Sequence, residues 1–181
     1  MDVDDFETVA SGKGVADDVI REISRTVRDA EKEDGFYISK TEVAPIAGEG
    51  AGTVLMQIEP EPSGGPARLL FRLNADAFKG RTLAELNYKI AQSQSIVANT
   101  LKEAVWHEIG HAKLIYGKRI DEIAELYDEL KPLGRPEVSR MAAYDGAEAI
   151  AEIEVLLRRG DGVSEDTMNF YLKYMKRGLL Q

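Results

Sequence analysis

Residues 100–117 read Thr100-Leu-Lys-Glu-Ala-Val-Trp-His-Glu-Ile-Gly-His-Ala-Lys-Leu-Ile-Tyr-Gly117 and predict one helix with both ends marked. Thr100 followed by Glu103 is the capping-box pattern that starts a helix. Gly117 suits the position just past the last turn, where a left-handed backbone ends a helix. Between these ends, apolar residues recur at helical spacing and indicate a buried face: Leu101, Val105, Ile109 and Ala112.

The same helix carries the pattern His107-Glu108-Ile-Gly-His111. Residues four apart lie about 40° apart around a helix, so both imidazoles point toward one spot and can share a metal ion. Glu108 is rotated about 100° from His107, which places its carboxylate beside a metal-bound water rather than among the ligands. Zinc lowers the pKa of such a water to about 7, and Glu108 would then act as the general base.

The alternative interpretation is a helix with two surface histidines and a solvated glutamate. Two observations disfavour it. The two histidines of the pattern are the only histidines in the chain. The pattern also lies inside a helix with its own start and end signals, which is the context that a zinc-binding helix requires. We therefore expect one zinc ion (Zn2+) per chain.

A catalytic zinc site takes three protein ligands and leaves one position open. Since the chain has no third histidine and no cysteine, the last ligand must be a carboxylate. The metzincin pattern is excluded, because Leu114 and Gly117 stand where it needs a glycine and a histidine. The best supply of carboxylates is a long helix expected from Pro136 to about Arg159.

Four acidic residues of that helix are candidates: Asp145, Glu148, Glu152 and Glu154. On a helical wheel, Glu154 shares a solvated face with Arg140 and Arg158 and is set aside. Asp145 lies roughly 60° from Glu148 and can reach the same side. Glu148 and Glu152 fall among apolar residues, where a carboxylate needs a partner. One of this pair can bind the metal while the other holds a histidine, or both can pair with a cation or reach solvent.

Upstream of the motif, the chain changes to strand-like patterns. Residues 1–14 are acidic and lack periodicity, which predicts a flexible lead-in. A helix is expected over about residues 15–33. Three β-favouring runs follow within residues 36–75: 36–46, 53–58 and 67–73. A Gly- and Pro-rich connection separates the last two runs and predicts a hairpin with a long loop.

Helices fill the rest of the chain. Start signals stand at Thr82 and Ser164, and an amphipathic pattern covers residues 120–130. We expect an α+β fold in which a small, mostly antiparallel sheet, at about residues 36–75, packs with the motif helix and the glutamate-bearing helix. Residues 15–181 are expected to form a single domain.

The composition excludes several classes of protein. The net charge of −9 disfavours nucleic acid as a partner. No segment approaches the roughly 20 apolar residues that span a bilayer, so no membrane association is expected. The first residues lack the basic and apolar regions of a secretory signal. The absence of cysteine excludes disulfides and thiolate ligands. A cytoplasmic location is the default expectation.

The motif and the downstream helix resemble those of the gluzincin peptidases. Gly110 within the motif and the Ala151-Glu152 pair are also similar to small bacterial and phage-borne zincin-like peptidases. The resemblance covers about residues 100–157 and is specific only at the motif. It implies a zincin-like fold for the domain, and a location in the cytoplasm of a bacterial or phage-infected cell, with virion association as an alternative.

The resemblance also assigns roles to individual residues. His107 and His111 would be metal ligands, and Glu108 would be the catalytic base. Glu148 would be the third ligand, and Glu152 would orient a ligand histidine through its other ring nitrogen. The chain departs from the family at Glu152, where an aspartate is commoner.

By the same analogy, an edge strand of the zincin sheet pairs with an extended substrate. Residues Ala67–Leu73 are the expected substrate-binding strand. Family members stabilise the oxyanion of the reaction with a tyrosine or a histidine, and no histidine remains for that role. Tyr144 and Tyr116 lie close enough in sequence to be candidates, although either can simply pack.

The expected function is the hydrolysis of a peptide bond in a protein or peptide substrate. One alternative is a zincin-like fold that binds a metal or a partner protein without cleaving it. Another is a peptidase module within a phage or virion assembly. The sequence leaves the substrate and the oligomeric state open.

Overall fold

The computed structural model describes residues 1–46 and 54–175, and these contain eight helices and three strands. The class is therefore α+β, as expected from the sequence. In chain order the elements are α1 (Val3–Gly12), α2 (Asp17–Asp34), β1 (Lys40–Ala44), β2 (Met56–Glu61), β3 (Arg68–Asn74), α3 (Ala75–Phe78), α4 (Leu83–Ala91), α5 (Leu101–Ile115), α6 (Ile120–Leu130), α7 (Gly146–Arg159) and α8 (Glu165–Met175).

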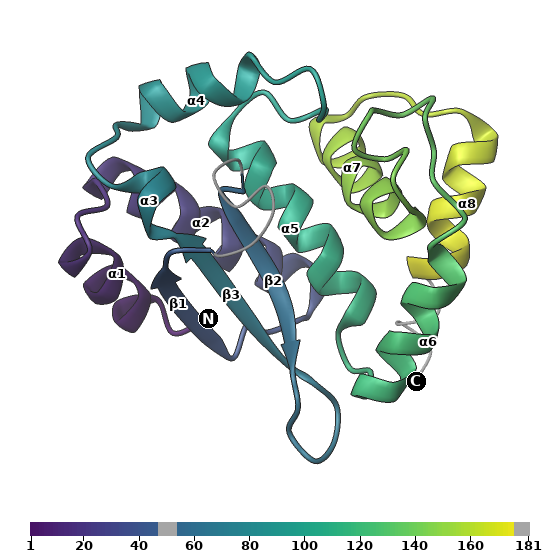
Figure 1. The fold of residues 1–181 in the computed structure, drawn as a ribbon, viewed down its shortest axis with the longest axis horizontal. Coiled ribbons are helices and arrows are strands. Elements are labelled where there is room, and N and C mark those ends of the chain that lie inside the picture. The colour runs from purple at the N-terminus through teal and green to yellow at the C-terminus, as the bar shows by residue number, and fades with distance from the viewer. Residues whose placement is uncertain (47–53, 176–181) are drawn as a thin grey trace.

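The sheet has the strand order β1-β3-β2, so β3 lies in the centre (Figure 1). β2 and β3 are antiparallel and form the expected hairpin, whereas β1 and β3 are parallel. The sheet is therefore mixed rather than mostly antiparallel. β1 joins the far edge of β3, and the chain reaches β2 by a separate connection.

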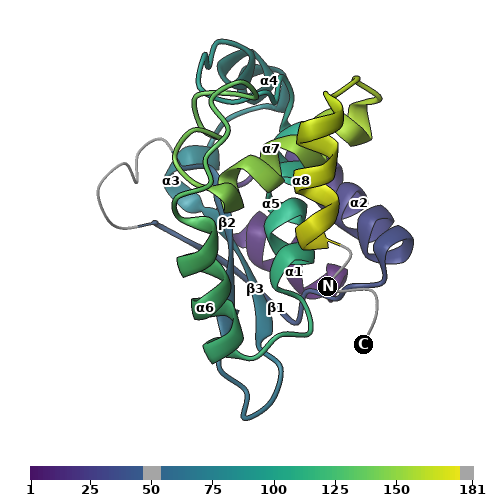
Figure 2. The ribbon, with the colours of Figure 1, turned by 90° about the vertical axis from the view of Figure 1, so that its right-hand side faces the viewer.

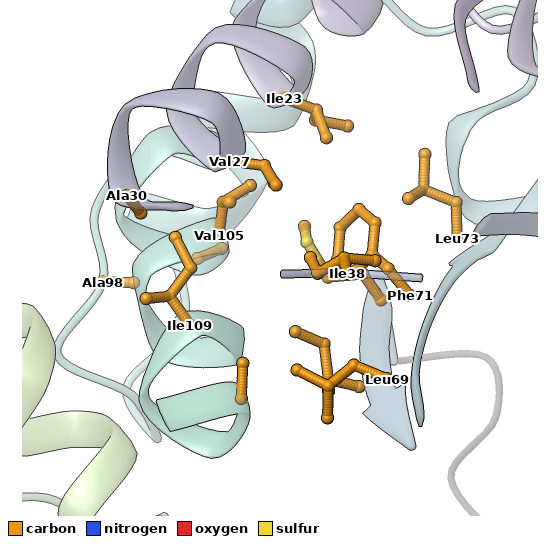
Figure 3. Close-up of a cluster of buried hydrophobic side chains, with 14 of the residues drawn as sticks. Ile23, Val27, Ala30, Ile38, Leu69, Phe71, Leu73, Ala98, Val105 and Ile109 are labelled. Carbon is orange, nitrogen blue, oxygen red and sulfur yellow. The ribbon is translucent and has the colours of Figure 1, made fainter. Parts of the chain in front are cut away.

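Helices cover one face of this sheet (Figure 1). Figure 3 shows side chains of α2 and α5 opposite side chains of the central strand, and these form the core: Ile23, Val27, Ala30, Leu69, Phe71, Leu73, Val105 and Ile109. Alternate residues of a strand point to opposite faces. Arg72 therefore points to the other face, where it pairs with Glu42 and Glu59, each at 3.1 Å. That face also carries the buried Leu70, and Figure 1 shows no helix layer across it.

The helices α7 and α8 lie beyond α5, away from the sheet, and Figure 2 looks at the molecule from their side. The helix α7 is shorter than expected, because it starts at Gly146 rather than near Pro136. Asp145 caps it by accepting hydrogen bonds from the N–H groups of Ala147 and Glu148. The preceding residues form turns, fixed by the hydrogen bond from Arg135 N to Ala142 O at 2.6 Å.

The first residues also differ from the expectation. Residues 1–14 contain the helix α1, rather than a flexible lead-in, and its Phe6 and Ala10 are fully buried. The segment has enough apolar surface to pack, because Phe6 lies against Phe71 of the central strand with ring centroids 6.4 Å apart. Among the described residues, no helix is both long and apolar enough to cross a bilayer.

Candidate metal centre

The helix α5 has the ends that its sequence predicts. The hydroxyl of Thr100 accepts a hydrogen bond from the N–H of Glu103 at 3.2 Å. The Glu103 carboxylate turns back to the N–H of Asn99, one residue before the cap. At the other end, Gly117 adopts a positive φ of 76°, which only glycine adopts without strain. These ends fix the register of the motif along the helix.

A close crossing of α5 and α7 brings the two halves of the site together. A Cβ atom added at Gly110 would lie 2.7 Å from the Cα of Ala151, closer than real Cβ atoms approach backbone. Glycine at this position therefore lets the two helix backbones nearly touch. Glu148 lies one turn before this crossing and Glu152 lies one residue past it. The carboxylates of both residues therefore reach the histidines of α5.

Three side chains converge at this crossing. The Nε2 atoms of His107 and His111 lie 3.3 Å apart. The Glu148 carboxylate lies 3.2 Å from Nε2 of His107 and 3.7 Å from Nε2 of His111. One ligand atom from each of the three residues lies within 4.8 Å of the others, so the group can hold a metal ion. The structure thus brings together the three residues expected to bind metal.

The spacing of the donor atoms fits zinc. Two nitrogens bound at about 2.0–2.1 Å in tetrahedral geometry lie about 3.3 Å apart, and the two Nε2 atoms have that separation. Two imidazoles and one carboxylate are also a donor set that zinc accepts at catalytic sites. With three protein donors and a pocket in front of them, a fourth position is open to a small ligand.

Glu152 fixes the orientation of His107. Its side chain is fully buried, and its Oε1 lies 2.9 Å from Nδ1 of His107. Its other oxygen accepts the N–H of Val97 at 2.7 Å. A carboxylate can only accept, so Nδ1 of His107 carries a proton and donates it, which leaves the Nε2 lone pair free for a metal. This is the orienting role that the resemblance implies for Glu152.

The carboxylates around His107 favour its charged form. Burial alone lowers the pKa of His107, but the hydrogen bonds to Glu148 and Glu152 outweigh burial and raise that pKa to about 10. Burial raises the pKa of Glu148, and the hydrogen bonds from both imidazoles reverse this and hold it well below its usual value. An imidazole must be neutral to coordinate a metal, so metal binding at His107 releases a proton.

Glu108 lines the same pocket as the three clustered donors and reaches strand β2. Its Oε2 accepts the backbone N–H of Ile58 at 2.9 Å. Burial raises the pKa of Glu108, opposed by the positive charges of His107 and His111. A carboxylate with a raised pKa binds a proton more readily than a solvated one, which suits a general base.

These groups line a pocket of about 930 Å³ between β2, α5, α6 and the start of α7. Tyr127 of α6 is a pocket residue that the sequence analysis missed. Burial, with the negative charges of Asp145, Glu148 and Glu108, raises the pKa of Tyr127 to about 12, so the phenol stays protonated as a donor. The sequence around Tyr127 predicts only an amphipathic helix and contains no motif that indicates a pocket residue.

Neither of the two tyrosines expected as oxyanion-stabilising candidates is buried in the pocket. Tyr144 borders the pocket but is 77% exposed, so its hydroxyl is solvated. Tyr116 is not among the residues that line the pocket, and its ring packs edge-on against Phe36 at 6.4 Å.

The expected substrate strand was also wrong. Residues Ala67–Leu73 largely form the central strand β3, which is paired on both sides and offers no free edge. The strand that borders the pocket is β2, an edge strand, and the pocket is lined by Met56–Ile58 of this strand and by Val54 and Leu55 before it. Strand order depends on long-range pairing and could not be read from the hydrophobic pattern of each strand.

The helical wheel misplaced Glu154. Its carboxylate is buried and not solvated, because Lys113 of α5 reaches it at 2.8 Å and Arg158 at 2.7 Å. Tyr171 of α8 also donates a hydrogen bond to it. Arg140, expected on the same face, lies outside α7 altogether. Glu154 is not part of the three-residue group that can hold a metal ion, and its carboxylate pairs instead with Lys113, Arg158 and Tyr171.

Comparisons of the chain with models of protein families, with curated proteins and with solved structures found no match.

The close helix crossing gives a testable prediction. Gly110→Ala removes a helix-weakening glycine, a gain of up to about 1 kcal/mol. It also forces a Cβ to within 2.7 Å of the Ala151 backbone, and overpacking of this kind costs about 1–3 kcal/mol. We expect the overpacking to outweigh the gain in helix propensity. The variant should then be less stable to denaturant and should bind zinc more weakly, because α7 moves away from α5.

Gly12→Ala is the matched control, because no atom lies within 4 Å of the added Cβ in the last turn of α1. It should leave zinc affinity unchanged and stability equal or slightly higher. Equal zinc affinity in the Gly110→Ala and wild-type proteins would show that the crossing does not hold the site together.

Proposed function

We propose that the protein is a zinc-dependent peptidase of the zincin-like, gluzincin type. The observation that carries this proposal is the buried Glu108 carboxylate beside the His107, His111 and Glu148 cluster, at the wall of an open pocket. A site that only stored or bound a metal would gain nothing from an additional buried carboxylate next to its ligands, since burying a charge is costly. A hydrolytic site needs that carboxylate as a base.

The arrangement of elements also supports the proposal. The motif helix α5 packs against a small sheet on one side and a glutamate-bearing helix on the other, as the resemblance implies. Zinc, when bound, supplies a Lewis acid that activates water and polarises a carbonyl. Glu108 accepts the proton of the attacking water and can return it to the leaving amine. Tyr127 keeps a phenol proton that can be donated within the same pocket.

The edge strand β2 supports a peptide substrate in an extended conformation. It borders the pocket over residues 56–58, and its outer edge is not paired with another strand of the described residues. A peptide that lies along this edge can form main-chain hydrogen bonds with the backbone groups of β2 that Glu108 does not occupy. Its scissile carbonyl would then lie beside Glu108 and the metal-binding residues.

The direct test is hydrolysis of denatured casein or a peptide library by the zinc-loaded protein, followed by mass spectrometry of the products. We expect cleavage that a chelator abolishes and that about one equivalent of zinc restores. Stoichiometric zinc binding without any cleavage would instead favour a non-cleaving protein that binds a metal or a partner. Cleavage that persists in chelator would contradict a metal-dependent mechanism.

A further inference from the structure

The contact between Glu108 and strand β2 joins two parts of the chain 50 residues apart in sequence. Both partners are buried, Glu108 on α5 and Ile58 on β2. Among the described residues, no partner is recorded for Oε1 of Glu108, whereas Oε2 accepts the N–H of Ile58 at 2.9 Å. The carboxylate is therefore held at one oxygen, and the other is left for the pocket that Glu108 lines.

The sheet does not need the N–H of Ile58. Ile58 lies opposite Phe71 in the antiparallel pair of β2 and β3. Residues opposite each other alternate between pairs that exchange hydrogen bonds and pairs that do not. Because the Ile58 N–H points to Glu108, Ile58 and Phe71 are a pair that does not exchange hydrogen bonds. Pro60, two residues on, supports this assignment, since proline has no N–H to contribute to a ladder.

We propose that the backbone amide of Ile58 is a positioning group for Glu108, so that the strand along which a peptide lies also sets the place of the base. The proposal rests on the proposed peptidase function. A carboxylate on a flexible side chain has many rotamers, and a charge-assisted hydrogen bond from a rigid strand selects one of them. The same strand then sets both the position of the substrate backbone and the position of the base.

The hydrogen bond can be deleted without changing a side chain. Incorporating the α-hydroxy acid of isoleucine at position 58 replaces the N–H by an ester oxygen. A double-mutant cycle with Glu108→Ala then measures the coupling from denaturant unfolding of the metal-free protein, without any substrate. We expect the ester to lower the unfolding midpoint more in the wild type than in the Glu108→Ala background, where only the weaker acceptor at the Gln57 carbonyl remains. Additive shifts would overturn the proposed contact.

Kinetics separate positioning from a merely structural role. In the zinc-loaded protein we expect the ester at position 58 to lower kcat about 10- to 100-fold, the range expected for a misplaced catalytic group. The KM and the zinc affinity should stay close to those of the wild type. A control ester at Leu70, whose N–H belongs to the β2–β3 ladder, should lower stability and leave kcat unchanged.

A second variant guards against poor incorporation of the ester. Ile58→Pro also removes the N–H, and an edge strand tolerates proline where the N–H faces away from the ladder. It should show the same loss of kcat with retained zinc. If the wild type cleaves peptides and both variants retain its kcat, the Ile58 amide does not position the base. If the zinc-loaded wild type cleaves nothing, the proposed function itself fails, while the unfolding cycle still reports on the contact.

Discussion

Glu108→Gln is expected to lower kcat by about 10²- to 10⁴-fold, the usual contribution of a general base, while the protein keeps its zinc and its fold. Glutamine has the same shape as glutamate, and its side-chain oxygen can still accept the N–H of Ile58. The amide cannot take up a proton from water, so only the chemical step should be affected. Single-turnover kinetics with metal analysis of the same sample separates the two effects.

Glu125→Gln on α6 is the matched control, because Glu125 is exposed and does not line the pocket. It makes the same chemical change and should retain the full rate. The Glu108→Gln protein also reveals contaminating peptidases, since these would cleave equally in both preparations. A Glu108→Gln protein with most of the wild-type rate would mean that Glu108 is not the base.

The second large effect concerns the metal ligands. His111→Ala and Glu148→Ala should each abolish tight zinc binding, because two remaining protein ligands rarely hold zinc against water. Glu152→Ala should weaken zinc binding about 10- to 100-fold, since Glu152 touches His107 but not the position between the three donors. Competition with a chromogenic zinc chelator measures all three affinities.

Asp145→Ala is the control for these substitutions, because Asp145 precedes Glu148 by three residues and acts as a helix cap. Its loss should reduce stability by about 1 kcal/mol and change zinc affinity little. If Asp145→Ala strips the metal and Glu148→Ala retains it, the third ligand is an aspartate and the gluzincin assignment is wrong.

The sequence predicted the features that arise within one element. The helix over residues 100–117 could be predicted because its cap, its apolar face and its terminal glycine are local signals. The two histidines had to share one side of that helix, because a spacing of four residues fixes their relative direction. The hairpin of β2 and β3 followed from two β-favouring runs around a Gly- and Pro-rich loop.

The tertiary structure decided how far each side chain is buried and which elements meet. Glu154 and Arg158 lie on one side of α7, but Lys113 from α5 makes that side buried. Residues 1–14 lack a clear periodicity, yet Phe6 finds a partner on the central strand. Tyr127 enters the pocket because α6 lies along it. Each of these contacts joins residues that are distant in sequence, and no local pattern records them.

Strand order is the clearest case of this division. Ala67–Leu73 and the run before it have similar apolar patterns, and nothing in these patterns places one strand at the edge and the other in the centre. β1 decides the order by pairing with β3 from a position 30 residues upstream. That pairing leaves β2 as the edge beside α5 and directs the Ile58 N–H to Glu108. The shared direction of the two histidines therefore follows from local spacing. The identity of the strand beside the pocket follows from long-range pairing, because strands pair through backbone groups that every residue except proline carries.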